Sequence, residues 1–180
     1  MDNNIIITTS LKGGVGKTSL CANFATFFVE QDIPVFVLDA DIQQSLSRHR
    51  KRDLEATPSA QVPWPVEFLN TTDIETVKKV MRRAKQLQCC VMIDCPGNIQ
   101  EPALQAIYEA ADIAIIPYEL NSDSVDATIM FAQLFKKNFK AKMFFIPNKV
   151  STVFEWRGEV RKAREDAMEA LDGKLGTVTP

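Results

Sequence analysis

A glycine-rich segment, Lys12-Gly13-Gly14-Val15-Gly16-Lys17-Thr18, constrains the fold of this chain more than any other feature. Three of the chain's seven glycines lie within four of its positions. Glycine lets successive backbone N–H groups point inward, which makes a nest for phosphate oxygens. A strand is predicted before the segment, at residues 4–9, and a helix after it, at residues 18–31, whose N-terminus adds donors and a partial positive charge. This order predicts a phosphate-binding loop.

A loop of this kind assigns chemistry to individual side chains. Lys17 can reach the β- and γ-phosphates of a nucleotide, and the Thr18 hydroxyl can hold Mg²⁺. Lys17 is also a candidate catalytic residue, because a cation there stabilises charge on a transferring phosphoryl group. The residues expected to bind the phosphates are Lys12, Gly13, Gly14, Val15, Gly16, Lys17, Thr18 and Ser19.

The rest of the chain alternates short β-branched runs with helical stretches, which is typical of βαβ units around a parallel sheet. Strands are predicted at 34–39, 66–69, 90–94, 113–117, 142–147 and 175–178. Helices are predicted at 43–55, 73–88, 99–111, 123–139 and about 153–171. The pattern predicts a doubly wound α/β fold with a mostly parallel sheet and helices on both faces. We expect a single domain over residues 1–180, truncated at its C-terminus, because the chain stops where such a fold usually continues.

Composition excludes several other classes of protein. Of the 180 residues, 46% are hydrophobic and 24% charged, with a net charge of −2, as in globular rather than disordered or strongly basic chains. No apolar run approaches the length that spans a bilayer, and no secretory signal is present. Four cysteines without a CxxC pair favour reduced thiols, a cytoplasmic location and no iron–sulfur cluster.

Two predicted strands end in carboxylates, the groups that hydrolysis needs to position metal and water beside a phosphate loop. Asp39-Ala40-Asp41 closes the strand at 34–39, and Asp94 closes the strand at 90–94. In parallel α/β sheets such strand ends open into the crevice where ligands bind. We interpret Asp94 as the acid that holds Mg²⁺ through water. Asp39 and Asp41 alternate along an extended segment, so only one of them needs to face the γ-phosphate.

The form KGGVGKT, with Leu11 in place of the usual first glycine and the extra Lys12, resembles the deviant Walker A motif of the ParA/MinD family of P-loop ATPases. The segment from Asp39 resembles the DxDPQ motif of that family, although Ile42 replaces its proline, and DCPG at 94–97 resembles its third motif. The resemblance covers residues 4 to about 150. It implies Mg-dependent hydrolysis of ATP, with Thr18, Asp39 and Asp94 near the metal.

The same resemblance implies roles for two further residues. Lys12 would reach the nucleotide across an ATP-sandwiched homodimer, as a catalytic residue of the partner's site. Asp41 would position the attacking water. The segment at 110–128 resembles the strand and helix that follow in the family, but Glu119, Leu120 and Asn121 replace part of the usual IPxxPS.

Among family members, the chain resembles the ParA-type partition ATPases most, including ParA-like proteins carried on conjugative elements. This implies a role in partition or maintenance of a plasmid or other mobile DNA, with a ParB-like stimulating partner and ATP-dependent, nonspecific DNA binding. Two other classes stay open: a MinD-like ATPase that positions cargo at a membrane, and an ATP-dependent small-molecule ligase of the same superfamily.

The nucleotide base is predicted from the segment Asn148-Lys149-Val150-Ser151. Many GTPases carry NKxD after the equivalent strand, and serine replaces the aspartate that would bind guanine. Asn148 can pair with an adenine edge through its amide, so ATP is favoured over GTP. Pro180 lies where a family loop approaches the adenine.

Two basic clusters bear on DNA binding. One is Arg48-His49-Arg50-Lys51-Arg52, and the other comprises Arg157, Arg161, Lys162 and Arg164. Acidic residues interleave with the second cluster, which is typical of a solvated, salt-bridged helix. The alternative is that both clusters, with Lys136, Lys137 and Lys140, contact DNA phosphates and place the protein on the nucleoid.

Overall fold

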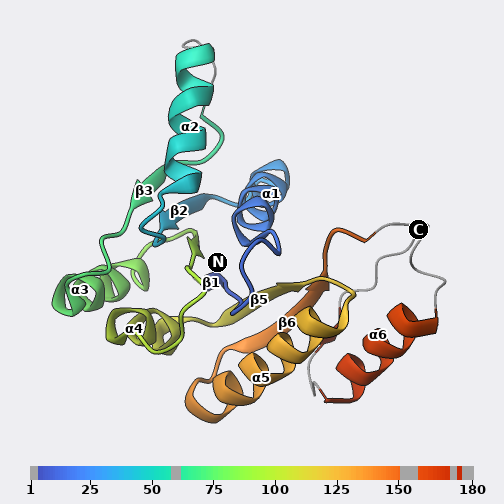
Figure 1. Cartoon of the computed structure of the whole chain (residues 1–180). Helices are drawn as coiled ribbons and strands as arrows, with labels where there is room; N and C mark the ends of the chain where they lie inside the picture. The colour runs from blue at the N-terminus through green and yellow to red at the C-terminus, as the bar shows by residue number, and fades with distance from the viewer. Residues whose placement is uncertain (1–3, 58–61, 151–157, 171–173, 176–180) are drawn as a thin grey trace.

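The structure is a computed structural model that describes residues 4–57, 62–150, 158–170 and 174–175 (Figure 1). The strands are β1 (Ile5–Thr8), β2 (Val35–Asp39), β3 (Val66–Phe68), β4 (Cys90–Asp94), β5 (Ile113–Tyr118), β6 (Lys142–Pro147) and β7 (Lys174–Leu175). The helices are α1 (Lys17–Glu30), α2 (Ser45–Ala56), α3 (Ile74–Ala84), α4 (Pro102–Ala110), α5 (Ser122–Asn138) and α6 (Gly158–Ala170).

The strands form one sheet in the order β3-β2-β4-β1-β5-β6-β7, and every neighbouring pair is parallel. The register aligns Thr8 with Asp94 and Asp39 with Asp94. The carboxyl ends of β1, β2 and β4 therefore meet at the same edge of the sheet, which is where ligands bind in folds of this kind.

Helices cover both faces of the sheet, as predicted. Alternate strand residues point to opposite sides, so that Ile6, Val37 and Met92 pack with α1 while Ile5, Ile7 and Val91 pack with α3, α4 and α5. Figure 1 shows α3 and α4 together on one flank, α5 beside α6 on another, and α2 projecting away from the rest. The prediction of a doubly wound α/β fold is confirmed.

Several elements differ from the prediction at their ends. The helix α3 ends at Ala84, short of residue 88, and α4 begins at Pro102, beyond the predicted start at residue 99. The predicted ends of the last helix, at about residues 153 and 171, lie outside the described residues. The proline-rich stretch before β3 buries Trp64, which is only 4% exposed, because its indole N–H donates to Thr26 Oγ1 (3.1 Å) and the ring packs against α1. Tertiary contact with α1 thus holds Trp64 in place.

The four cysteines are all free thiols, and Cys21, Cys90 and Cys95 are buried. In the described part of the chain, no helix combines the length and apolar character needed to cross a membrane.

Candidate nucleotide-binding site

The glycine-rich segment forms the turn between β1 and α1, as the sequence predicts. Gly14 and Gly16 have positive φ angles of 75° and 95°, a region that glycine adopts without strain. Gly16 is the N-cap residue of α1, so the loop passes directly into the N-terminus of the helix. Lys12, Gly13 and Gly14 are exposed, whereas Val15 is fully buried and anchors the loop.

The side chain of Asn148 braces this loop from the end of β6. Its Nδ2 atom donates a hydrogen bond to the Val15 carbonyl at 2.8 Å. A Cβ atom at Gly16 would collide with the same amide. The shape of the loop therefore depends on glycine at position 16 for two reasons, backbone conformation and space.

Lys17 lies at the centre of the polar residues. Its Nζ atom donates to the Lys12 carbonyl at 3.3 Å. Burial lowers the pKa of Lys17, and the neighbouring Asp94, Asp41 and Cys95 act in the opposite direction. The turn after β4 closes against the loop, because a Cβ atom at Gly97 would lie 3.0 Å from the Ser10 carbonyl oxygen.

Asp94 is buried with one carboxylate oxygen unused. Its Oδ1 accepts from Thr8 Oγ1 at 3.3 Å, whereas Oδ2 has no hydrogen-bond partner among the described residues. Burial raises the pKa of Asp94 to about 6, and the Asp39 carboxylate adds to the increase; the hydroxyls of Thr18 and Thr8 and the Lys17 ammonium oppose it. A buried carboxylate oxygen without a donor is poised for a cation.

Asp39 is the register partner of Asp94, but both of its carboxylate oxygens accept hydrogen bonds. Its Oδ2 accepts from both the backbone N–H and the hydroxyl of Ser47, each at 2.9 Å, and its Oδ1 accepts from the Asp41 N–H at 3.3 Å. Asp39 therefore ties the root of α2 to the end of β2. The sequence did not indicate this contact, since Ser47 is eight residues away.

Asp41 begins a well-formed turn, although this chain lacks the proline of the DxDPQ motif. Its Oδ1 accepts from the Gln43 N–H at 2.8 Å, and its carbonyl accepts from the Gln44 N–H at 2.8 Å. Ile42, which replaces the proline, is 72% exposed. Burial lowers the pKa of Lys17, and the charge of Asp41 is one of those that oppose this change.

Mg²⁺ fits these residues. The Thr18 hydroxyl and the two carboxylates at positions 39 and 94 supply only oxygen atoms, which this cation prefers. Mg²⁺ commonly uses one or two protein carboxylates and completes its shell with water and substrate phosphates. No group of three or more His, Cys, Asp and Glu residues that could hold a metal occurs within the described ranges, in keeping with such a sparse set.

Asn148, one of the two predicted base-binding residues, directly follows β6. Asn148 uses its amide nitrogen on Val15, so pairing with adenine would fall to its carbonyl oxygen or require this bond to break. Lys149 forms an ion pair with Glu119 at 2.9 Å, and this pair lowers the pKa of Glu119. Pro180 lies outside the described residues.

The basic clusters are only partly described. On α2, Arg48, His49, Lys51 and Arg52 are exposed, but the Arg50 guanidinium stacks 3.9 Å above the Trp64 ring. Arg157 and the side chains of Arg161 and Arg164 lie outside the described residues, and Lys162 is exposed on α6.

Ser19, the last of the predicted phosphate-binding residues, is exposed in the first turn of α1. It lines a cavity of about 180 Å³ with Thr18, Arg50 and Trp64.

Solved structures share this architecture. The fold is similar to that of a plasmid partition protein from Borrelia burgdorferi B31 bound to AMPPNP, with a TM-score of 0.75, 19% identity, and coverage of 100% of this chain and 88% of that chain. It is also similar to the Aquifex aeolicus MinC:MinD cell division complex (TM-score 0.73, 22% identity, coverage 96% and 79%) and to pNOB8 ParA bound to nonspecific DNA (0.69, 15%, 93% and 74%). At these identities the likeness establishes the fold alone.

Comparisons of sequence show the family of the chain. It is 25% identical to the protein ParA of Rhizobium radiobacter over 125 residues, which are 69% of this chain and 52% of that protein. The chain thus spans about half the length of this relative. Residues 6–165 match the family model of the CobQ/CobB/MinD/ParA nucleotide binding domain. The chain therefore belongs to the ParA/MinD family of nucleotide-binding domains.

Proposed function

We propose that this chain binds Mg-ATP and hydrolyses it slowly to ADP and phosphate. The observation that carries the proposal is the Asp94 Oδ2 atom, which is buried without a donor beside Lys17 and Thr18 at the mouth of the phosphate loop. Thr18, Asp39 and Asp94 would hold Mg²⁺, which neutralises charge on the phosphate oxygens when bound. Lys17 would exchange the Lys12 carbonyl for phosphate oxygens.

We further propose that ATP binding controls a homodimer. The Lys12 side chain is exposed at the rim of the loop, where a second subunit can approach, and this supports its assignment to the partner's nucleotide. Asp41 lies two residues beyond the end of β2, its charge acts on Lys17, and it is the candidate that orients the attacking water. In this proposal the bound nucleotide, ATP or ADP, would decide whether the protein is a dimer, and the rate of hydrolysis would decide only how long the dimer lasts.

The proposed biological role is partition or maintenance of a plasmid or other mobile DNA element. Support comes from the ParA relative, from the plasmid partition protein of B. burgdorferi, and from pNOB8 ParA, which is solved on nonspecific DNA. The proposal includes ATP-dependent contact with DNA phosphates, association with the nucleoid, and a ParB-like protein that stimulates hydrolysis. The exposed cations of α2 are candidates for that contact.

A MinD-like positioning ATPase is the second candidate, favoured by the similarity to MinD structures from Aquifex aeolicus. The two candidates differ in the surface that the ATP form occupies. Sedimentation with anionic liposomes, in the presence of ATP, would support the MinD-like role, and retention on random-sequence DNA would support the partition role.

The decisive experiment measures DNA binding against salt concentration with ATP, with ADP and without nucleotide. ATP alone should promote binding, with a log–log slope that falls by about 0.9 for each phosphate contact removed. Replacing Arg48, Lys51 and Arg52 by glutamate, or Arg157, Arg161 and Arg164 by glutamate, should flatten this slope equally on all sequences. DNA binding that is the same with and without ATP would rule out the proposed switch.

A further inference from the structure

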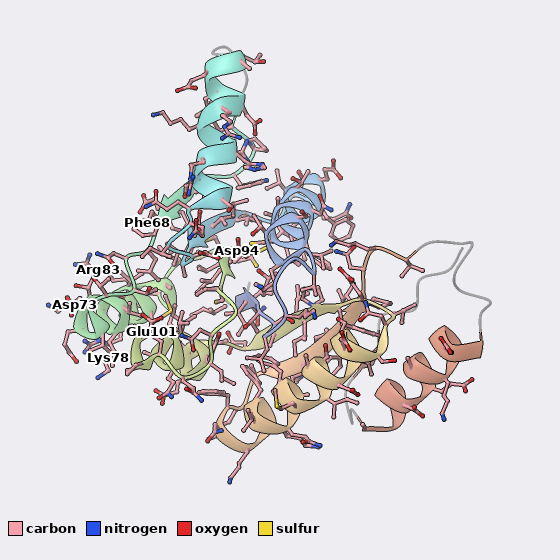
Figure 2. The ribbon with its side chains drawn as sticks, viewed as in Figure 1. Phe68, Asp73, Lys78, Arg83, Asp94 and Glu101 are labelled. Atoms are coloured by element: carbon pink, nitrogen blue, oxygen red, sulfur yellow. The ribbon has the colours of Figure 1, made fainter. Side chains whose placement is uncertain are left out.

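The helix α3 carries a basic cluster that lies apart from the nucleotide site. Its members are Lys78, Lys79, Arg82, Arg83 and Lys85, all of them exposed. Figure 2 shows Lys78 and Arg83 at the edge of the molecule, well away from Asp94. Lys78 pairs with Glu75 at 3.1 Å, but no carboxylate of the described residues pairs with Arg82, Arg83 or Lys85. In a chain of net charge −2, this helix is a local excess of positive charge.

A groove runs between this cluster and α4. It has a volume of about 490 Å³. Three cations line it on the α3 side and outnumber two carboxylates, one of which is already paired with a lysine, and buried side chains provide an apolar lining; the lining residues are Lys78, Arg82, Lys85, Glu75, Glu109, Met81, Ala106 and Ala110. The small alanine side chains of α4 are what leave this space open.

A second groove lies on the other side of α4, against α5. It has a volume of about 280 Å³, and its lining is mixed: Ile99, Leu134 and Phe139 are apolar, whereas Gln100, Gln105, Glu109 and Asn138 are polar. Leu134 is 41% exposed and lies in this groove, so a partner side chain could cover it. Glu109 lines both grooves, so the two grooves adjoin across α4.

We propose that this surface, the α3–α5 face, docks an acidic amphipathic helix of a partner protein. Acidic side chains of the partner would meet Arg82 and Lys85, and apolar side chains would cover Leu134 and Phe139, in the helix-in-groove mode of recognition. The apolar side chains of Ile99, Leu134 and Phe139 in the second groove favour a protein over a nucleic acid, because apolar side chains offer nothing to phosphates. The docking goes beyond the proposed ATPase and requires no nucleotide.

The test uses a fluorescein-labelled 20-residue peptide with leucine at helical spacing on one face and glutamate elsewhere. Fluorescence anisotropy should show saturable binding to the full chain. Arg82→Glu with Lys85→Glu should raise Kd at least about tenfold, because attraction is replaced by repulsion. Leu134→Ser should also weaken binding. The matched control, Lys51→Glu with Arg52→Glu on α2, should bind as the wild type does.

These substitutions alter exposed side chains, and unchanged thermal melting would show that each variant folds. A peptide with lysine in place of glutamate should not bind. Equal binding of the two peptides, or an unchanged Kd in the Arg82/Lys85 variant, would overturn the proposal. So would a short DNA duplex that displaces the peptide and depends on Arg82 and Lys85 but not on Leu134, since that result would make the α3–α5 face a nucleic-acid site.

Discussion

Asp39 and Asp94 are register partners on adjacent strands, yet only Asp39 has hydrogen-bond donors for both of its oxygens. Asp39 is held by Ser47 and Asp41, while Asp94 keeps Oδ2 without a donor. Burial, together with the nearby Asp39 carboxylate, raises the energy of the charged state of Asp94. The site is therefore built at a cost in stability, which a bound cation would offset.

Replacing Asp94 by asparagine should stabilise the nucleotide-free protein and abolish Mg-dependent ATP binding. The pKa of Asp94 is about 6 in the folded protein against an ordinary 3.8, so above pH 6 the variant should gain up to about 3 kcal/mol in unfolding free energy. Below pH 6 the folded wild type takes up a proton, and the difference should shrink towards pH 4.

Chemical denaturation across pH 4–8 measures this effect. Asp53→Asn, an exposed substitution on α2, is the matched control and should leave the stability unchanged. A variant at position 94 that is less stable than the wild type at pH 7.5 would contradict the assignment of Asp94 as a strained, cation-ready group.

Replacing Lys17 by alanine should weaken the affinity for Mg-ATP. A charge-assisted contact to phosphate contributes about 1.5–3 kcal/mol, or roughly 10- to 100-fold in Kd. Isothermal calorimetry measures the change, with Lys79→Ala on α3 as the control. An unchanged affinity would refute the phosphate-loop interpretation.

Lys12→Ala and Asp41→Ala should separate dimerisation from chemistry. If Asp41 orients the attacking water, Asp41→Ala should bind ATP, hydrolyse it about 10²–10⁴-fold more slowly and accumulate as a dimer. If Lys12 serves the partner's site, Lys12→Ala should bind ATP and stay monomeric. Light scattering with ATP distinguishes the two, and two monomeric variants would count against the sandwich dimer.

Gly16→Ala should disable the loop whether or not Asn148 is present. The substitution forces a Cβ both into a φ of 95° and against the Asn148 amide. Asn148→Ala alone should cost about 1 kcal/mol of stability through the lost bond to Val15. The double variant removes the collision but keeps the strain, so it should still bind ATP poorly in the calorimetric assay. Full recovery would show that space alone requires glycine there.

Local patterns predicted most of the fold. The strands at 90–94 and 142–147 are found with the predicted bounds, because each is a compact apolar run limited by polar or turn residues. The glycine loop could be identified because its chemistry is contained in seven adjacent residues. The end of α3 and the start of α4 could not be predicted to the residue, since helix termini depend on caps and packing that periodicity does not reveal.

Contacts between distant segments were beyond the reach of the sequence. The amide of Asn148 has the chemistry to pair with adenine, which is why the sequence indicates that contact. The fold instead brings this amide to the Val15 carbonyl, 133 residues away. Trp64 is buried by Thr26 and Arg50, neither of which is near it in sequence. The basic residues of α3 stand in the sequence as KK and RR pairs. Only the fold places them beside a groove at α4.

The projecting helix α2 has a mechanical consequence. Its contacts with the body are concentrated at the root, in the Asp39–Ser47 bonds, the buried Leu46 and the Arg50–Trp64 stack, while residues 51–56 are exposed. At about 1.5 Å per residue it is a lever roughly 18 Å long. A tilt of about 10° at the root would move its far end by roughly 3 Å. A small displacement of the Asp39 carboxylate, which holds Ser47, would therefore become a larger displacement at the far end of α2.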